Sequence, residues 1–195
     1  NINMIGPNCL GTYDTYTDLD CLFLPRERMK RPKQGCLSFI CQSGALGGVM
    51  LDLAAEENFG VSKFISYGNA TQIDESDLIE YLGEDKNTKV ICLYVEGIKN
   101  GDKFFKTAMK VSKKKPIIAL KGGLTNEGQK ATLSHTGALA GNKDIYFGIF
   151  KQTGIIRAES LEEMFNIASL FEKGIHFSGN RLLVITNGGG YGIIS

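Results

Sequence analysis

GCLSFICQSGALGG, residues 35–48, joins an apolar run to a small-residue turn and the start of a helical pattern. Residues 35–42 predict a buried strand, because the run is apolar nearly throughout instead of alternating with polar residues. A helix is expected to follow over residues 45–58. A strand of this kind that leads directly into a helix is typical of a parallel sheet covered on both faces.

The same succession of strand and helix recurs along the chain. Ser160 is expected to cap the last helix, with Glu163 completing a capping box. Five such units predict an α/β fold with a flavodoxin-like doubly wound parallel sheet, whose strand order the sequence does not specify. The further strands are expected at 61–68, 89–97, 115–123 and 154–158, and the further helices at 74–82, 104–114 and 160–171.

The two ends of the chain are expected to lie outside this sheet. Residues 1–33 carry no strand–helix unit, and residues 24–34, LPRERMKRPKQ, have the polar composition of a connector. Residues 180–195 predict a sixth strand that runs into a glycine turn. We therefore expect the chain to be part of a larger protein, with the tail of one domain at its start and the beginning of another at its end.

Composition excludes several classes of protein. The formal net charge of +1 gives no electrostatic basis for binding nucleic acid or an anionic membrane. No apolar run approaches the ~20 residues that span a bilayer, and the N-terminal residues do not have the pattern of a signal peptide. The five cysteines are odd in number and form no CxxC pair, which favours reduced thiols in a cytoplasmic protein. No metal site is predicted.

Three polar features fall at the carboxyl ends of the predicted strands, where α/β sheets bind their ligands. Gln42, Ser43 and Gly44 follow the first strand, Glu96 ends the third, and a loop of about twenty residues carrying His135 follows the fourth. A neutral imidazole is a competent nucleophile, and a carboxylate on its second nitrogen would fix the tautomer. The turn at residues 42–44 would expose backbone N–H groups suited to a phosphate. Together these groups could hold a phosphoryl group on a histidine.

Each feature also has an ordinary structural explanation. Ser43 could simply cap a helix, Glu96 could be an exposed charge at a strand end, and a histidine in a loop is more often a surface residue than a catalytic one. The glycine turn near residue 190 is by itself a weak phosphate signal. His176 is assigned no role. A serine hydrolase is excluded, because Ser43 does not lie in a G-x-S-x-G elbow.

Five motifs resemble the NDP-forming acyl-CoA synthetases of the succinyl-CoA synthetase superfamily, of the ADP-forming acetate–CoA ligase type, α subunit or α-like half. The resemblance extends over essentially the whole chain. The motifs are GPNCLG (6–11), CQSGALG (41–47), YVEGI (94–98), SHTGALAG (134–141) and TNGGGYG (186–192).

The resemblance implies a role for particular residues. His135 would be phosphorylated, and Glu96 would support it. The helix beginning at Ser43 and Gly44, with Gln42 before it, would provide one phosphate site. The turn at Gly188, Gly189 and Gly190 would provide a second. The candidate residues of the CoA and active-site loops are Asn8, Cys9, Ser134, Thr136 and Gly137.

The resemblance also implies a domain organisation. Residues 1–33 would be the C-terminal tail of a CoA-binding Rossmann domain plus a linker, and residues 34–178 a succinyl-CoA synthetase-like flavodoxin domain. Residues 179–195 would begin a second flavodoxin-like domain. The implied partners are an ATP-grasp nucleotide-binding subunit or domain, in a hetero- or homo-oligomer.

The implied reaction interconverts acyl-CoA, phosphate and ADP with a carboxylate, CoA and ATP. ADP or ATP would bind with Mg²⁺ outside this chain, so the chain alone is not expected to catalyse the full reaction. Two departures from the family pattern are Tyr191, where relatives often have proline, and Gly122-Gly123-Leu124 after Lys121, where relatives often carry Gly-Arg.

Two other functions remain open at this point. The same domains occur as regulatory regions of protein-lysine acetyltransferases, whose members often lose the histidine that this chain keeps. A sheet of this kind could alternatively bind FMN or another phosphate ligand at the same edge. The second alternative leaves the pairing of His135 with Glu96 without a purpose.

Overall fold

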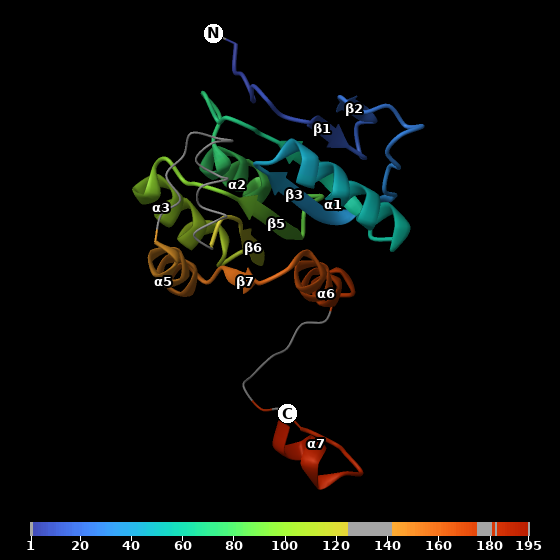
Figure 1. The fold of residues 1–195 in the computed structure, drawn as a ribbon, viewed down its shortest axis with the longest axis vertical. Coiled ribbons are helices and arrows are strands. Elements are labelled where there is room, and N and C mark those ends of the chain that lie inside the picture. Colours follow the sequence, from blue (N-terminus) through green and yellow to red (C-terminus); the bar gives the residue numbers. More distant parts are fainter. Residues whose placement is uncertain (1, 125–141, 175–180, 182, 195) are drawn as a thin grey trace.

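The computed structural model describes residues 2–124, 142–174, 181 and 183–194. These residues form a seven-stranded sheet with helices on both faces (Figure 1). The elements in chain order are β1 (Gly11–Asp14), β2 (Leu19–Leu22), β3 (Gln34–Cys41), α1 (Gly44–Glu56), β4 (Val61–Ser66), α2 (Glu75–Glu84), β5 (Val90–Val95), α3 (Gly101–Val111), β6 (Ile117–Lys121), α5 (Lys143–Thr153), β7 (Ile156–Ala158), α6 (Leu161–Glu172) and α7 (Gly189–Ile194).

Five parallel strands in the order β4-β3-β5-β6-β7 form the centre of the sheet and confirm the predicted flavodoxin-like fold. Numbered along the chain, this is the 2-1-3-4-5 order of flavodoxin-like proteins. The register aligns the carboxyl ends of the strands: Cys41 pairs with Ser66 and Tyr94, and Val95 pairs with Lys121. The residues that follow these strands therefore meet at one edge.

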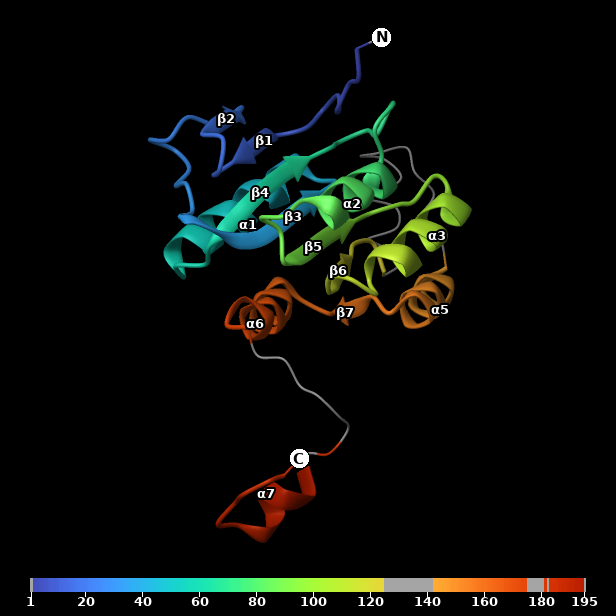
Figure 2. The same ribbon diagram turned by 180° about the vertical axis from the view of Figure 1, so that it is seen from behind.

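Two hydrophobic cores hold the helices on the sheet. One includes Met50 of α1 and Phe165 of α6, and the other includes Ile79 of α2, Phe104 of α3 and Phe150 of α5. Figures 1 and 2 accordingly show α1 and α6 on one face, and α2, α3 and α5 on the other. The strands are buried from both sides, as their apolar sequences predict.

The N-terminal residues correct one expectation. Strands β1 and β2 form an antiparallel hairpin, and β1 pairs antiparallel with β4 through Thr12 and Ile65. The expectation that all of residues 1–33 lie outside the sheet is therefore wrong for residues 11–22. The hairpin satisfies the backbone groups along β4, which would otherwise form an open edge. The boundaries with neighbouring domains stay a prediction.

The predicted sixth strand is also wrong within the described residues. Residues 183–186 form no strand, and the glycine turn begins the short helix α7, which lies apart from the sheet in Figure 1. A strand needs a neighbour to pair its backbone N–H and C=O groups, and the apolar sequence of 183–186 alone does not provide one.

The Ser160 cap of α6 is confirmed, but the predicted capping box with Glu163 is wrong. The Ser160 hydroxyl accepts a hydrogen bond from the Glu163 N–H at 3.1 Å. The Glu163 carboxylate accepts from the N–H of Glu159 at 2.6 Å, and not from Ser160 as a capping box requires. The reciprocal bond is thus displaced by one residue.

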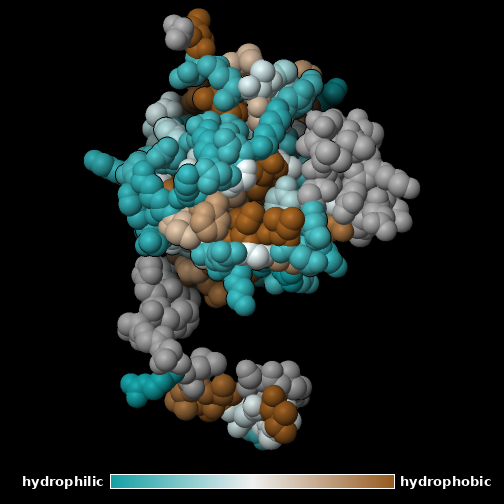
Figure 3. Space-filling view, turned by 90° about the vertical axis from the view of Figure 1, so that its left-hand side faces the viewer, coloured by the Kyte–Doolittle hydropathy of each residue, from teal (hydrophilic) through white to brown (hydrophobic). Residues whose placement is uncertain are grey.

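The surface that carries α3 and α5 is largely hydrophilic, with a group of hydrophobic residues at its middle (Figure 3). Ile98, Ile145 and Ile149 line a pocket of about 170 Å³ on α5 and the loop before α3. Among the described residues, no helix combines the length and the apolar character needed to cross a bilayer.

Candidate functional site

The turn between β3 and α1 is built from side chains that bond to the backbone. The Gln42 side chain is buried, and its Oε1 accepts hydrogen bonds from Glu96 N–H at 2.7 Å and Gly97 N–H at 3.1 Å. The Ser43 hydroxyl accepts from Leu46 N–H at 3.3 Å and caps α1. The ordinary explanation of Ser43 as a helix cap is thus confirmed, and the Gln42 amide oxygen is occupied in holding β5.

The first N–H groups of α1 remain available. Neither Gly44 nor Ala45 donates its backbone N–H to an acceptor among the described residues. Unpaired N–H groups at a helix start carry the positive end of the helix dipole and favour an anion. The N–H groups that could serve the anion site predicted for residues 42–44 are therefore those of the α1 backbone, and that site stays a prediction.

A cavity of about 520 Å³ lies against this helix start. It brings together predicted residues from distant parts of the chain, namely Asn8 and Cys9 with Gln42 and Gly44. Ser43 and Glu96 do not line it. The remaining lining residues are Leu10, Phe23, Leu24, Ala45, Gly48, Gly68 and Asn69.

Residues 6–9 reach this cavity because they are bound to the end of β4. Asn69 N–H donates to Pro7 O at 3.0 Å, and Thr71 N–H donates to Gly6 O at 3.1 Å. Gly68 has a φ of +54°, and a Cβ there would lie 2.2 Å from the Pro7 carbonyl oxygen. Only glycine permits this approach, which places Asn8 and Cys9 beside α1.

Most polar atoms of Glu96 form a hydrogen bond. Its N–H donates to Gln42, its C=O accepts from the Lys121 ammonium at 2.8 Å, and its Oε1 accepts from the Tyr94 hydroxyl at 3.3 Å. Glu96 is only 7% exposed, and its Oε2 has no hydrogen-bond partner among the residues that the structure describes. The alternative of an exposed strand-end charge is therefore wrong. A buried carboxylate oxygen without a partner is costly and marks a position where a donor is expected to bind.

Tyr94 and Gly122 fit together behind this carboxylate. A Cβ at Gly122 would lie 2.4 Å from the Tyr94 hydroxyl oxygen, so a side chain there would displace the donor to Glu96. Burial, followed by the charge of Glu96, raises the pKa of Tyr94 well above its usual range, and the phenol stays a hydrogen-bond donor.

Lys121 is a site residue that sequence reasoning missed. It ends β6 with 4% exposure, and its Nζ donates to the carbonyl oxygens of Glu96 and Gly122. Burial lowers its pKa to about 8, partly offset by the charge of Glu96. A lysine closing the otherwise apolar strand IIALK was the available signal, because Lys is rarely buried without a reason.

His135 lies outside the described residues, as do Ser134, Thr136 and Gly137. The described residues that flank this segment do lie at the carboxyl edge: Leu124 and Lys143 line, with Lys121, a cavity of about 380 Å³. The structure does not bring Gly188, Gly189 and Gly190 to α1, since α7 lies apart from the sheet (Figure 1). The roles of these seven residues therefore stay predictions. Among the described residues, no group of acidic, histidine or cysteine side chains could hold a metal ion.

Comparisons with known proteins agree on one family. Residues 34–171 match the succinyl-CoA ligase like flavodoxin domain. Over its full length the chain is 47% identical to an ADP-forming acetate–CoA ligase from Methanocaldococcus jannaschii, and the aligned region covers 27% of that protein. It is 43% identical to the alpha subunit of ADP-forming acetate–CoA ligase II from Pyrococcus furiosus, and the aligned region covers 41% of that subunit.

A solved structure supports the same assignment. The dinucleotide forming acetyl-coenzyme A synthetase 1 of Ca. Korarchaeum cryptofilum, in complex with phosphate and ADP, matches with a TM-score of 0.87 at 40% sequence identity. The match covers 97% of this chain and 40% of that one. The chain thus spans well under half the length of the proteins that it resembles.

Proposed function

The chain belongs to the family of the succinyl-CoA ligase like flavodoxin domain, and we propose that the protein containing it is an ADP-forming acid–CoA ligase. The reaction is acyl-CoA + phosphate + ADP ⇌ carboxylate + CoA + ATP. The names of the relatives support this activity over a regulatory region of a lysine acetyltransferase or an FMN-binding module. CoA and nucleotide substrates fit a cytoplasmic protein.

The proposed mechanism proceeds through two intermediates. Phosphate attacks the thioester carbonyl of acyl-CoA, the carbon–sulfur bond breaks, and CoA leaves as the thiolate to give an acyl phosphate. A nitrogen of neutral His135 then attacks the phosphorus, and the bond to the acyl oxygen breaks to release the carboxylate. The phosphohistidine finally transfers its phosphoryl group to ADP, which restores the imidazole.

The observation that carries this proposal is the Oε2 of Glu96, which is buried and has no partner within the described part of the chain. The surrounding bonds hold Glu96 rigidly and leave one oxygen for an N–H donor. An imidazole N–H on that oxygen would leave the other nitrogen free to attack phosphorus. The carboxylate would also stabilise the positive charge that develops on the ring.

The cavity beside α1 is the proposed site of the acyl phosphate. The free N–H groups of Gly44 and Ala45 would bind phosphate oxygens, and Asn8 and Cys9 would contact the thioester end of CoA. A second phosphate site at Gly188, Gly189 and Gly190 would form when residues 179–195 belong to a second flavodoxin-like domain. The two sites would then hold the phosphohistidine between helix N-termini.

The remaining parts of the reaction require groups beyond this chain. An ATP-grasp domain or subunit would bind ADP or ATP with Mg²⁺, and a CoA-binding domain would hold the rest of CoA. The Pyrococcus furiosus relative is itself an alpha subunit. We therefore propose a hetero- or homo-oligomer in which His135 carries the phosphoryl group to the nucleotide.

His135→Ala tests the proposal in the full protein with its nucleotide-binding domain or subunit. We expect ATP formation from acyl-CoA, phosphate and ADP to fall to background, because no other group carries the phosphoryl. Incubation of the unmodified protein with ATP and Mg²⁺ should place acid-labile, base-stable phosphate on His135. The matched control is His176→Ala at the other histidine of the chain, which should keep both signals. Substantial turnover by His135→Ala would refute the proposal.

A further inference from the structure

Lys121 contacts the ends of β5 and β6 and a side chain of α5, and β6 and α5 flank the segment that carries His135. Its Nζ donates to the backbone oxygen of Glu96 after β5 and to that of Gly122 after β6. The same ammonium lies 4.6 Å from the ring centroid of Tyr146 on α5. Because β6 precedes residues 125–141 and α5 follows them, one side chain contacts both flanks of the segment.

Lys121 differs from Lys63, another buried lysine of the sheet, in having no ion pair among the described residues. Lys63 has a side chain that is 7% exposed, and it forms ion pairs with Asp85 at 3.1 Å and Asp14 at 3.5 Å. Lys121 is 4% exposed and forms no ion pair among the described residues. Buried charges are normally paired, and an exception points to a charge that is balanced only in a functional state.

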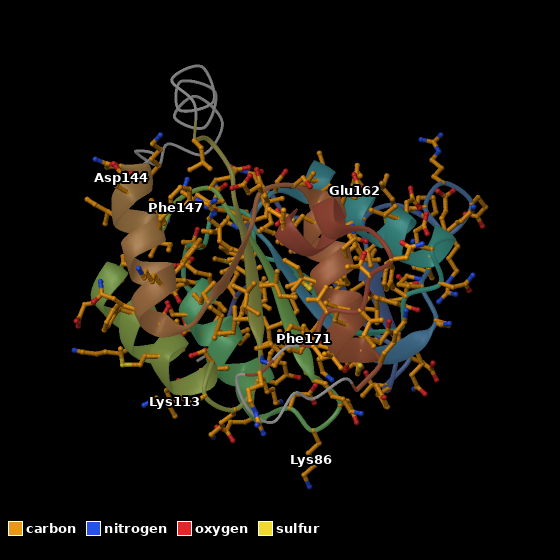
Figure 4. The ribbon with its side chains drawn as sticks, turned by 90° about the horizontal axis from the view of Figure 1, so that it is seen from below. Lys86, Lys113, Asp144, Phe147, Glu162 and Phe171 are labelled. Carbon is orange, nitrogen blue, oxygen red and sulfur yellow. The ribbon has the colours of Figure 1, made fainter. Side chains whose placement is uncertain are left out.

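The surroundings of Lys121 favour an anion. It lines the cavity of about 380 Å³ together with Lys143 and Arg157. Arg157 of β7 lies 4.1 Å from the ring centroid of Phe147, which is labelled on α5 in Figure 4. Glu159 is the carboxylate that lines this cavity, and it is paired with Arg157. Positive charges therefore outnumber negative ones among the described residues that line this cavity.

We propose that Lys121 is a positioning residue for the phosphohistidine: it holds Glu96 and both flanks of the histidine segment, and it balances the negative charge that phosphorylation adds. This inference rests on the proposed function. The ammonium does not transfer a proton to the phosphoryl group. It acts through the Glu96 backbone, the flanks of the segment and its electrostatic field.

The proposal predicts a pH dependence. Within the described part of the chain, the charged and titratable groups around Lys121 are Tyr94 and Glu96 at the end of β5, Lys143 and Tyr146 of α5, and Arg157 and Glu159 at β7. Burial raises the pKa of Tyr94 and of Tyr146, so both stay neutral near pH 8. Lys121, with its pKa lowered to about 8, is charged below that pH and neutral above it. The rate at which His135 is phosphorylated should therefore fall as pH rises through about 8.

The experiment measures the rate at which His135 gains phosphate from ATP and Mg²⁺ in the full protein, between pH 6 and 9.5. Lys121→Met should lower the rate at pH 7 by about 10- to 100-fold, the range for losing a hydrogen bond from a charged donor. Lys121→Arg, which stays charged, should keep most of the rate and should not show the loss above pH 8.

Lys115→Met is the matched control. Lys115 also donates to two backbone carbonyls, those of Leu82 and Asp85, but at the amino end of the sheet. We expect this variant to keep the unmodified rate and pH profile. An equal loss in Lys115→Met would show a general structural effect and would overturn the proposal.

The remaining outcomes are also decisive. An unchanged rate and profile in Lys121→Met would overturn the proposal and leave the proposed function intact. If Lys121→Met does not fold, the same alkaline loss in Lys121→Arg and in the unmodified protein would overturn it instead. If the unmodified protein gains no phosphate on His135, the proposed function fails, and this inference fails with it.

Discussion

The hydrogen bonding of buried polar side chains differs between the two ends of the sheet. Near the amino end, Asp85 accepts hydrogen bonds from Lys63 at 3.1 Å and Thr88 at 2.6 Å, and the Thr88 hydroxyl bonds to Ser38 at 2.8 Å. Buried side-chain atoms of the described residues that lack a partner belong to Ser62, Tyr67, Glu75, Ser76 and Glu96. All but Ser62 lie beyond the carboxyl ends of the strands.

We infer from this difference that buried polar groups at the amino end mainly stabilise the fold, and that those around Glu96 mainly serve function. The network of Lys63, Asp85, Thr88 and Ser38 near the amino end is satisfied and holds the strands together. Unsatisfied atoms at the carboxyl end cost free energy of folding, so each marks a position where a binding partner is worth testing for. Substitutions at the amino end should therefore change stability, and those around Glu96 should change phosphoryl transfer.

Glu96→Gln should produce the largest effect. The amide removes the negative charge that we propose supports the imidazole, and we expect the phosphorylation rate of His135 to fall by about 10²- to 10⁴-fold, the range for such orienting carboxylates. Thermal unfolding should change little, because Gln keeps the shape of the side chain. Glu162→Gln makes the same change at an exposed position of α6, labelled in Figure 4, and should leave the rate unaltered. A normal phosphohistidine yield in Glu96→Gln would remove Glu96 from the mechanism.

Lys63→Met should have the next largest effect, on stability. Burial alone would raise the pKa of Asp85, but hydrogen bonds from Thr88 and Lys63 hold it below its usual value. Removing the lysine leaves this carboxylate buried without its cation, which typically costs about 3 to 5 kcal/mol of unfolding free energy. Denaturant titration measures the loss.

A control at the surface sharpens the Lys63 result. Lys106→Met removes an exposed pair with Asp102 on α3 and should cost less than about 0.5 kcal/mol. If the two substitutions destabilise the protein equally, the amino-end network does not have the structural role assigned to it.

Apart from the control variants, Glu75→Gln should give the smallest effect, and one that depends on pH. Glu75 is 2% exposed, and burial raises its pKa to about 7 from 4.5. The folded state therefore binds more protons than the unfolded state between these values, so the unmodified protein loses stability as pH rises through this window. The gain in stability of Glu75→Gln should be about 2 to 3 kcal/mol larger at pH 8.5 than at pH 4.5. Denaturant titrations at both pH values test this, and an equal gain at both would contradict the assignment.

Much of the fold was predictable because its signals are local. The apolar run at 35–42 became β3, and the run at 89–97 became β5, each shifted by only one or two residues. Ser160 caps α6 as its position predicts. The hairpin of β1 and β2 was missed because residues 11–22 lack a continuous apolar run, and their pairing with β4 spans about fifty residues of chain.

The site was predictable only in part. Residues 42–44 and Glu96 were expected at one edge, and the bonds from Glu96 and Gly97 to Gln42 confirm that they meet there. Nothing near Gln42 in the sequence indicates that its amide would bind β5 instead of an anion. Lys121 was missed as a site residue for the same reason, since its importance depends on Glu96 and Tyr146, each about 25 residues away.

The sequence by itself determined the parallel sheet, the cap of α6 and the candidate groups at the carboxyl edge, because periodicity, capping and turn chemistry act over a few residues. It placed the start of α3 three residues late, at 104 instead of Gly101. Tertiary structure alone decided which of those groups are already bonded and which are left open. Whether a buried oxygen or ammonium has a partner depends on distant segments that converge in space, and the described segments leave Glu96 Oε2 without a hydrogen bond and Lys121 without an ion pair.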